Sequence, residues 1–211
     1  MKVLAYCITE AEFESPDLRG VASAEVGQFV EGELRCFVSQ HEIFPTTEMQ
    51  RAALEYYHVL STILSQVALI PFRFPTLLAD TTELIRHIRE RYEDYDSALE
   101  RLRDAVQMEA RISFDGAPEQ APEAASGREY LQARGQQLHG LEAAAAVLKH
   151  AVAPWVLDWR QRMSAHGLRC YVLVNRKSIK DFQRTAADVS SRGSHIHVSG
   201  PWPASEFLEP Q

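Results

Sequence analysis

The stretch YYHVLSTILSQVALIPFRFPTLLAD, Tyr56 to Asp80, decides how this chain can fold. Its first half belongs to a helical stripe of apolar residues spaced three and four apart: Met49, Ala53, Tyr56, Leu60, Ile63 and Val67. Its second half is apolar but is interrupted by Pro71 and Pro75. Because proline removes the N–H that a sheet ladder needs, we expect either a bent edge strand or two short strands there. Helix next to strand in this order favours an α+β protein.

The sequence on both sides of this stretch predicts further strands and helices. Alternating or β-branched segments predict strands over 2–9, 33–40, 106–114, 168–175 and 195–200. Apolar stripes predict helices over 80–102, 126–152 and 178–189, and Pro154 predicts a kink or a new helix that ends at Gly167 and carries Trp155 and Trp159 on one face. We expect residues 10–33 to form a loop.

These elements predict two small ferredoxin-like α/β sandwich domains with antiparallel sheets. The expected boundary lies near Asp104, so that the domains cover residues 1–104 and 105–211. The second domain would contain an acidic surface loop over 115–126, which is rich in proline, and the C-terminal Gly-Pro-Trp-Pro tail.

Composition and charge exclude several classes of protein. The formal net charge of −7 argues against nucleic-acid binding, which needs a basic patch. No apolar segment is long enough to span a bilayer, and the N-terminus is interpreted as a strand rather than a signal peptide. The cysteines Cys7, Cys36 and Cys170 lie far apart in apolar segments, which predicts buried thiols in a reduced, cytoplasmic protein.

The search for catalytic chemistry yields weak candidates. Neither a glycine-rich phosphate loop nor a nucleophile elbow is present, so no cofactor is predicted. His195 and His197 lie two apart in a predicted strand and could face one metal ion, with Cys170 as a conceivable third ligand. The alternative, which we favour, places both histidines on the half-exposed face of the last strand.

A charged residue interrupts the proline-broken strand. Arg73 lies inside the sequence Pro-Phe-Arg-Phe, and we expect it to pair with a carboxylate, with Glu109 as the first candidate. Binding of an anion is the alternative.

The tail has two possible uses. Pro201 and Pro203 fix the backbone on either side of Trp202 and hold its indole in one orientation. The tail could cap the open end of the C-terminal core, which we favour, or present Trp202 and Phe207 to a partner.

Four stretches together resemble the gas vesicle accessory proteins of the GvpF/GvpL family. They are LAYCIT at the start, the stretch quoted first above, SGREYLQAR at the opening of the third predicted helix, and VSGPWPASEF at the end. They keep the family order and cover most of the chain. Two departures stand out: Pro75 replaces a family glycine, and Ala204, Ser205 and Glu206 stand where the family has Pro, Tyr and Ser.

The resemblance implies a cytoplasmic, non-enzymatic protein that is needed to build gas vesicles. The expected partners of this protein are the small hydrophobic shell protein and other gas vesicle accessory proteins. The resemblance implies no catalytic residues. The partner-binding residues that we expect are Phe72, Phe74 and Leu77 on the proline-broken strand, and Trp202 and Phe207 in the tail. The alternative is a small-molecule or metal-binding module, or an enzyme, on tandem ferredoxin-like domains.

Overall fold

The computed structural model describes residues 1–13, 17–114, 127–164, 167–189 and 194–208, so the acidic loop predicted over 115–126 lies outside the described residues. The chain forms two compact units, each with a four-stranded antiparallel sheet. Unit 1 combines Met1–Ala105 with the end of the chain from Trp202 onward, and unit 2 is Val106–Pro201. The predicted α+β class is confirmed.

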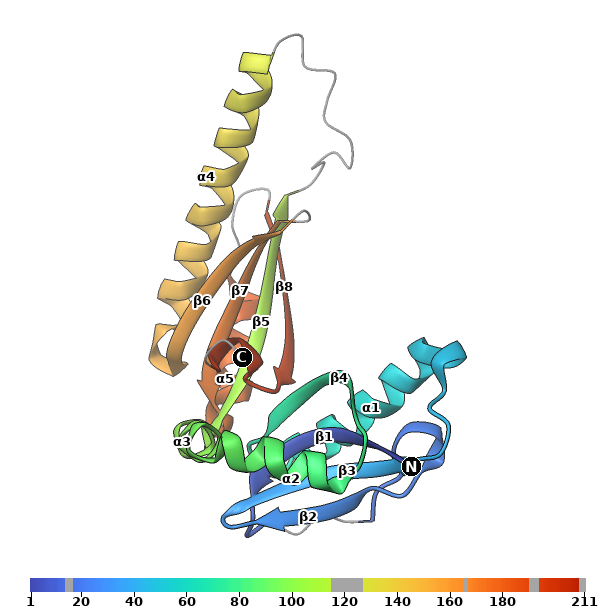
Figure 1. Cartoon of the computed structure of the whole chain (residues 1–211). Helices are drawn as coiled ribbons and strands as arrows, with labels where there is room; N and C mark the ends of the chain where they lie inside the picture. The colour runs from blue at the N-terminus through green and yellow to red at the C-terminus, as the bar shows by residue number, and fades with distance from the viewer. Residues whose placement is uncertain (14–16, 115–126, 165–166, 190–193, 209–211) are drawn as a thin grey trace. The chain divides into compact units, whose positions relative to one another are not determined.

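The sheet of unit 1 has the strand order β2-β3-β1-β4 (Figure 1). The strands are β1 (Lys2–Glu10), β2 (Gly27–Glu31), β3 (Leu34–His41) and β4 (Ile70–Leu78). β4 is an edge strand, as its two prolines predicted. β2 lies in the segment 10–33, which was expected to be a loop because it is rich in Glu, Ser and Gly. It forms by pairing with β3.

Helices cover both faces of this sheet: α1 (Met49–Leu64) lies on one, and α2 (Thr81–Glu90) and α3 (Tyr92–Leu102) lie on the other (Figure 1). Residues 3–9 of β1 are therefore buried without interruption. Tyr6 stacks on Tyr56 of α1, with ring centroids 5.0 Å apart. On the opposite face a cluster joins β1, β3 and β4 to α2 and α3: Val3, Ala5, Ile8, Leu34, Cys36, Ile70, Leu84, Ile88, Tyr95 and Leu99.

The single helix predicted over 80–102 is two helices that meet at Arg91. Its predicted start is confirmed, because Asp80 Oδ1 accepts a hydrogen bond from Glu83 N at 2.9 Å. In return, Glu83 Oε2 accepts one from Ala79 N at 2.7 Å. This reciprocal cap fixes where the chain leaves β4 and enters the α2 layer.

Unit 2 has the element order strand, helix, strand, strand, helix, strand, and its sheet order is β6-β7-β5-β8. Its elements are β5 (Ala105–Phe114), α4 (Gly127–Val152), β6 (Val156–Ser164), β7 (Gly167–Asn175), α5 (Ile179–Asp188) and β8 (Ser194–Trp202). This is the ferredoxin-like connectivity. Its core lies between the sheet and the two helices and includes Met108, Ala110, Ile112, Leu141, Leu148, Cys170, Val172 and Phe182.

Unit 1 has the same strand order with a different set of helices. The connection from β1 to β2 holds a short 3-10 helix, η1 (Val21–Ser23), at the position of the first crossover helix. α1 is the second crossover helix, and α2 and α3 are additions after β4. Unit 1 is therefore a ferredoxin-like sheet with one helix lost and two gained.

The helix predicted from Pro154 to Gly167 is wrong. Pro154 lies in a short 3-10 helix, η3 (Ala153–Trp155), after which Val156–Ser164 forms β6 and pairs antiparallel with β7. Trp155 and Trp159 therefore share no helix face, although both pack against the core of unit 2. The tertiary pairing with β7 overrides the four-residue spacing of the tryptophans.

The two compact units divide the chain differently from the expected domains 1–104 and 105–211. The chain leaves unit 2 at Pro201, and the residues from Trp202 onward belong to unit 1.

Candidate protein-binding surface on the N-terminal unit

The C-terminal tail packs on unit 1. Pro203, Ala204 and Phe207 are buried, and Phe207 is only 1% exposed. Arg101 Nη2 donates a hydrogen bond to the carbonyl oxygen of Phe207 at 2.9 Å. Leu208 packs against the cluster between the sheet and the α2–α3 layer. The tail is a cap, as favoured from the sequence, but it caps the core of unit 1 instead of the C-terminal core.

The start of the tail meets the opposite helical layer. The half-buried Trp202 lies against Tyr57 of α1, with ring centroids 5.3 Å apart and an angle of 49° between the rings. Tyr57 remains 39% exposed, and partial burial raises the pKa of its phenol. The two rings thus form an aromatic surface that is half open to solvent.

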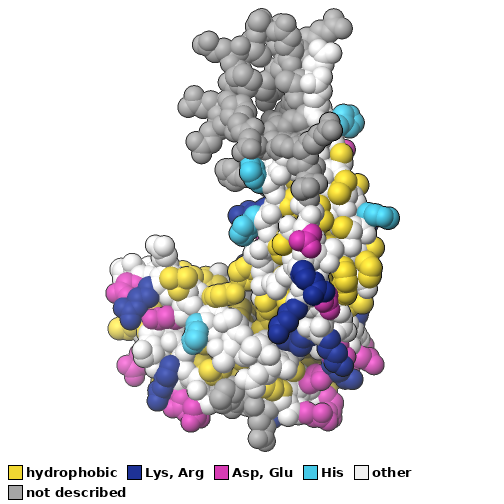
Figure 2. All heavy atoms as spheres, turned by 180° about the vertical axis from the view of Figure 1, so that it is seen from behind, with side chains coloured by type: hydrophobic (Ala, Val, Ile, Leu, Met, Phe, Trp, Pro, Cys, Tyr) yellow, Lys and Arg dark blue, Asp and Glu magenta, His cyan; other side chains and the backbone are white. Residues whose placement is uncertain are grey.

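This aromatic pair continues along α1 to Leu54, which is 66% exposed. Leu54, Tyr57 and Trp202 are named here the α1–tail patch. Seen from the side of the molecule shown in Figure 2, hydrophobic side chains gather over α1. The buried stripe of α1 is separate from this patch and consists of Ala52, Tyr56, Val59, Leu60, Ile63 and Leu64.

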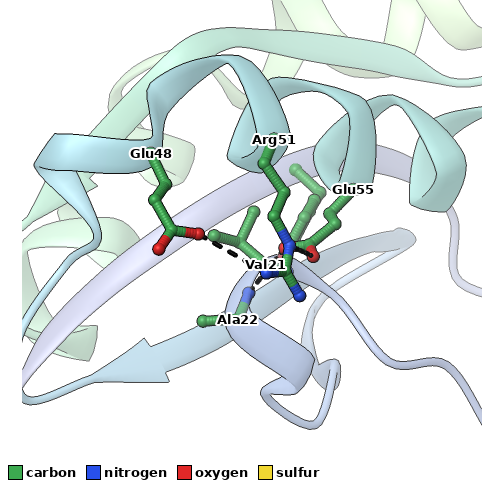
Figure 3. A network of polar contacts seen from close by, with 6 residues as sticks. Val21, Ala22, Glu48, Arg51 and Glu55 are labelled. Atoms are coloured by element: carbon green, nitrogen blue, oxygen red, sulfur yellow. Dashed lines mark hydrogen bonds and ion pairs between the residues drawn. The ribbon is translucent and has the colours of Figure 1, made fainter.

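A third face of α1 holds the loop that contains η1 (Figure 3). Glu55 Oε2 accepts a hydrogen bond from the backbone N–H of Ala22 at 2.8 Å. Arg51 lies between Glu55 and Glu48, with N–O distances of 3.0 and 3.5 Å. The hydrogen bond from Ala22 is the largest cause that lowers the pKa of Glu55. This network links the loop that contains η1 to α1, the helix that carries Leu54 and Tyr57.

A buried hydrogen-bond chain lies beneath the same loop. Val21 N donates to Tyr6 Oη at 2.9 Å, Tyr6 Oη lies 2.9 Å from Ser39 Oγ, and Ser39 Oγ lies 2.7 Å from His41 Nε2. Because Tyr6 Oη accepts from Val21 N, its own proton is directed to Ser39 Oγ. The Ser39 hydroxyl in turn donates to Nε2 of a neutral His41. Burial lowers the pKa of His41, which agrees with this neutral form.

β4 departs from regular pairing beside α1. Pro71 is opposite Cys7 and Thr76 is opposite Ala5, so residues 72–75 of β4 face the single residue Tyr6. Tyr56 Oη from α1 lies within hydrogen-bond distance of the carbonyl oxygens of Tyr6 and Phe72, at 2.8 and 2.7 Å. Because the hydroxyl carries one proton, it donates to one of these two carbonyl oxygens at a time, beside the irregularity in β4.

The irregular segment sends the two predicted phenylalanines in different directions. Phe72 lies 5.8 Å from His87 of α2, measured between ring centroids. Phe74 lies 4.9 Å from Tyr56 of α1. Both are half-buried, as is Leu77. The structure therefore does not unite Phe72, Phe74 and Leu77 with Trp202 in one patch, and it places Phe207 in the core.

The expected pairing of Arg73 with Glu109 stays a prediction, because the two residues belong to different units. Arg73 is exposed between the half-buried Phe72 and Phe74, within the irregular segment of β4. No carboxylate in the described part of unit 1 forms an ion pair with it. Glu109 lies 2.8 Å from Arg111 and 3.8 Å from Arg169, measured between side-chain N and O atoms.

His195 and His197 are both exposed on β8, in agreement with the favoured prediction that they lie on the solvent side of the last strand. Cys170 cannot join it, because β5 lies between β7 and β8 and Cys170 is fully buried in the core of unit 2. Within the described ranges, no group of three or more His, Cys, Asp or Glu side chains could hold a metal ion. Burial raises the pKa of each cysteine thiol, so these thiols are neutral core residues.

Leu54 and Tyr57 were missed from the sequence. The signal was present: both are apolar residues on a helix that lie outside its buried stripe. What the sequence lacked was the distant Trp202 that lies beside them.

Comparisons with known proteins agree with this architecture. The family model described as gas vesicle synthesis protein GvpL/GvpF matches residues 2–209. The crystal structure of the gas vesicle protein GvpF from Anabaena sp. PCC7120 superposes with a TM-score of 0.82 at 14% identity, covering 100% of this chain and 97% of that chain. GvpF from Microcystis aeruginosa superposes with a TM-score of 0.79 at 12% identity, covering 99% of each chain.

No curated protein sequence matches the chain. Among the helices that the structure describes, none is long and apolar enough to cross a membrane. The structural matches share the two-unit fold, and the family model covers nearly every residue. The resemblance recognised in the sequence is therefore confirmed: this chain belongs to the GvpL/GvpF family of gas vesicle synthesis proteins.

Proposed function

We propose that this protein assists gas vesicle assembly by binding the small hydrophobic shell protein through the α1–tail patch, without catalysis. Family membership supports the role in gas vesicle synthesis. The exposed side chains of Leu54 and Tyr57 beside Trp202 support the location. The protein would act in the cytoplasm and at the gas vesicle, and other vesicle accessory proteins would be further partners.

The observation that carries the proposal is the aromatic pair of Tyr57 and Trp202, which stays half open to solvent next to an exposed leucine. Tryptophan and tyrosine flanked by apolar residues are typical anchors of protein interfaces. An unassembled shell protein would expose apolar, strand-forming surface that aggregates unless it is covered. An acidic chain with a net charge of −7 would keep such a complex soluble.

The edge strand β4 is proposed as the flank of this interface. Pro71 and Pro75 remove backbone donors from the edge, which prevents its pairing with another copy of itself. The half-buried side chains of Phe72, Phe74 and Leu77 still offer apolar area to a partner. Phe207 stabilises the tail from within and is not part of the proposed contact surface.

The test is co-purification of the tagged protein with the shell protein, at moderate salt and with a chelator present. Leu54→Ser and Tyr57→Ser should reduce recovery of the shell protein severalfold. Val30→Ser is the matched control, because Val30 is an exposed apolar residue on β2 of the same unit, 48% exposed. Normal recovery with the patch variants would reject the patch. Absence of recovery with the unmodified protein, together with normal vesicles in a deletion strain, would reject the function.

A further inference from the structure

A second exposed strand edge lies in unit 2. β6 is the terminal strand of its sheet, and no further strand pairs with it among the described residues. Most of its residues are exposed, from Leu157 and Asp158 to Met163. A terminal strand presents N–H and C=O groups along its outer side, where another strand can pair with it.

A groove runs beside this edge, between α4 and β6. It has a volume of about 400 Å³ and is lined by Glu142, Ala145, Ala146, Lys149, Trp159 and Gln161. Lys149 Nζ lies 5.8 Å from the centroid of the Trp159 ring. The alanines leave the floor of the groove open to small apolar side chains. Hydrophobic side chains continue along the α4 side of unit 2 (Figure 2), where Leu138 and Val147 are exposed.

The other face of β6 is basic. Since Trp159 and Gln161 point toward α4, Arg160 and Arg162 lie on the face of the sheet away from the helices. Arg162 lies over the ring of Tyr171 at 6.0 Å, and Arg160 lies 3.8 Å from Asp158. Arg111 and Arg169 lie on both sides of Glu109 on the same face. Among the described residues of this face, the arginines are Arg111, Arg160, Arg162 and Arg169 and the carboxylates are Asp158 and Glu109, in a chain whose net charge is −7.

We infer that β6 accepts an extended segment of a partner protein as an added strand, and that this segment alternates apolar and acidic residues. An added strand sends successive side chains to opposite faces. On one face they would enter the groove beside Trp159, where apolar groups fit. On the other face they would meet Arg160 and Arg162, which favour carboxylates. This surface is independent of the α1–tail patch, which lies in unit 1.

Two other occupants fit less well. A single-stranded nucleic acid would need exposed aromatic rings on which its bases can stack, whereas Tyr171 on this face is only 7% exposed and lies under Arg162. A second copy of β6 paired antiparallel about Gln161 would place Arg160 opposite Arg162, and like charges directly opposite destabilise a sheet. An acidic segment avoids both difficulties. Glu109 between two arginines shows that this face already holds a carboxylate.

The probe is a short blocked peptide that alternates valine and glutamate and carries a fluorophore, with a valine–lysine peptide as its counterpart. Fluorescence anisotropy with the full chain should show binding of the glutamate peptide alone. The double variant Arg160→Glu, Arg162→Glu should weaken binding by about tenfold or more. Ala146→Trp should fill the groove and weaken it similarly.

Matched controls separate the site from general charge and bulk. Arg184→Glu reverses one exposed charge on α5, and Ala143→Trp adds bulk to an exposed position of α4 that does not line the groove. Both should bind like the unmodified chain, and circular dichroism should show that every variant is folded. The proposal is overturned by no binding of the glutamate peptide, by equal binding of the lysine peptide, or by variants that bind normally. Preferential binding of a single-stranded oligonucleotide, or self-association lost in the double arginine variant, would overturn it as well.

Discussion

Replacement of Phe207 by alanine should destabilise unit 1, although this residue lies close to the end of the chain. Its side chain is only 1% exposed, and the residue is held by the hydrogen bond from Arg101 to its carbonyl oxygen. Phe→Ala changes in a packed core cost about 3–5 kcal/mol. With a urea dependence of about 2 kcal/mol/M, the midpoint of unfolding should fall by about 1.5–2.5 M.

The assay needs a signal from unit 1 alone. The chain has three tryptophans, and Trp155 and Trp159 lie in unit 2. With both replaced by phenylalanine, the fluorescence of Trp202 reports the unfolding of unit 1. Urea titrations of this background with and without Phe207→Ala then measure the loss directly.

Leu54→Ala is the matched control, because Leu54 is a large apolar residue of the same unit but is 66% exposed. Its free energy of unfolding should change by no more than about 0.5 kcal/mol. A midpoint for Phe207→Ala within about 0.3 M of the background would refute the reasoning, since it would show that the tail contributes no core.

Three further predictions concern the layer under α1. Gly20→Ala should cost about 1–3 kcal/mol, because a Cβ there would lie 2.0 Å from Tyr6 Oη and disturb the hydrogen bond from Val21; an unchanged thermal midpoint would contradict this. Ala22→Gly should raise stability by about 1 kcal/mol or less, because Ala22 has a left-handed φ of 52°, and a lower melting temperature would contradict the prediction. The stability of unit 1 should fall as the pH drops from about 7 to 5, because burial lowers the pKa of His41 and of His87 and the unfolded chain then binds more protons. His41→Gln should make this dependence less steep, and an equally steep loss in that variant would exclude a contribution from His41.

The proline-broken stretch determined much of what could be predicted. Pro71 and Pro75 correctly indicated an edge strand with an irregularity, and the spacing of Asp80 and Glu83 correctly indicated a helix start. These signals are local, since each depends on backbone donors within a few residues. The order of the predicted helices and strands then indicated the α+β class, because only a few arrangements of sheets and helices in layers fit such an order.

The features that the sequence analysis missed depend on contacts between residues far apart in the chain. β2 exists only through its ladder to β3, and β6 only through its ladder to β7, so neither needed a strong pattern of its own. The α1–tail patch combines Leu54 and Tyr57 with Trp202, which is far away in the chain. A periodicity argument finds the exposed residues of one helix but cannot identify what lies beside them.

The destination of the tail follows from the topology of unit 2. In its sheet, β5 and β8 are antiparallel neighbours, so the start of β5 at Ala105 and the end of β8 at Trp202 lie at the same end of the sheet. Folding of unit 2 therefore returns the chain close to where it left unit 1 and removes most of the entropy cost of closing the long loop. Contacts such as that between Arg101 and Phe207, 106 residues apart in the sequence, then form with little further loss of freedom. In this view unit 2 is an insertion within unit 1, and Pro201 and Pro203 stiffen the point where the chain re-enters.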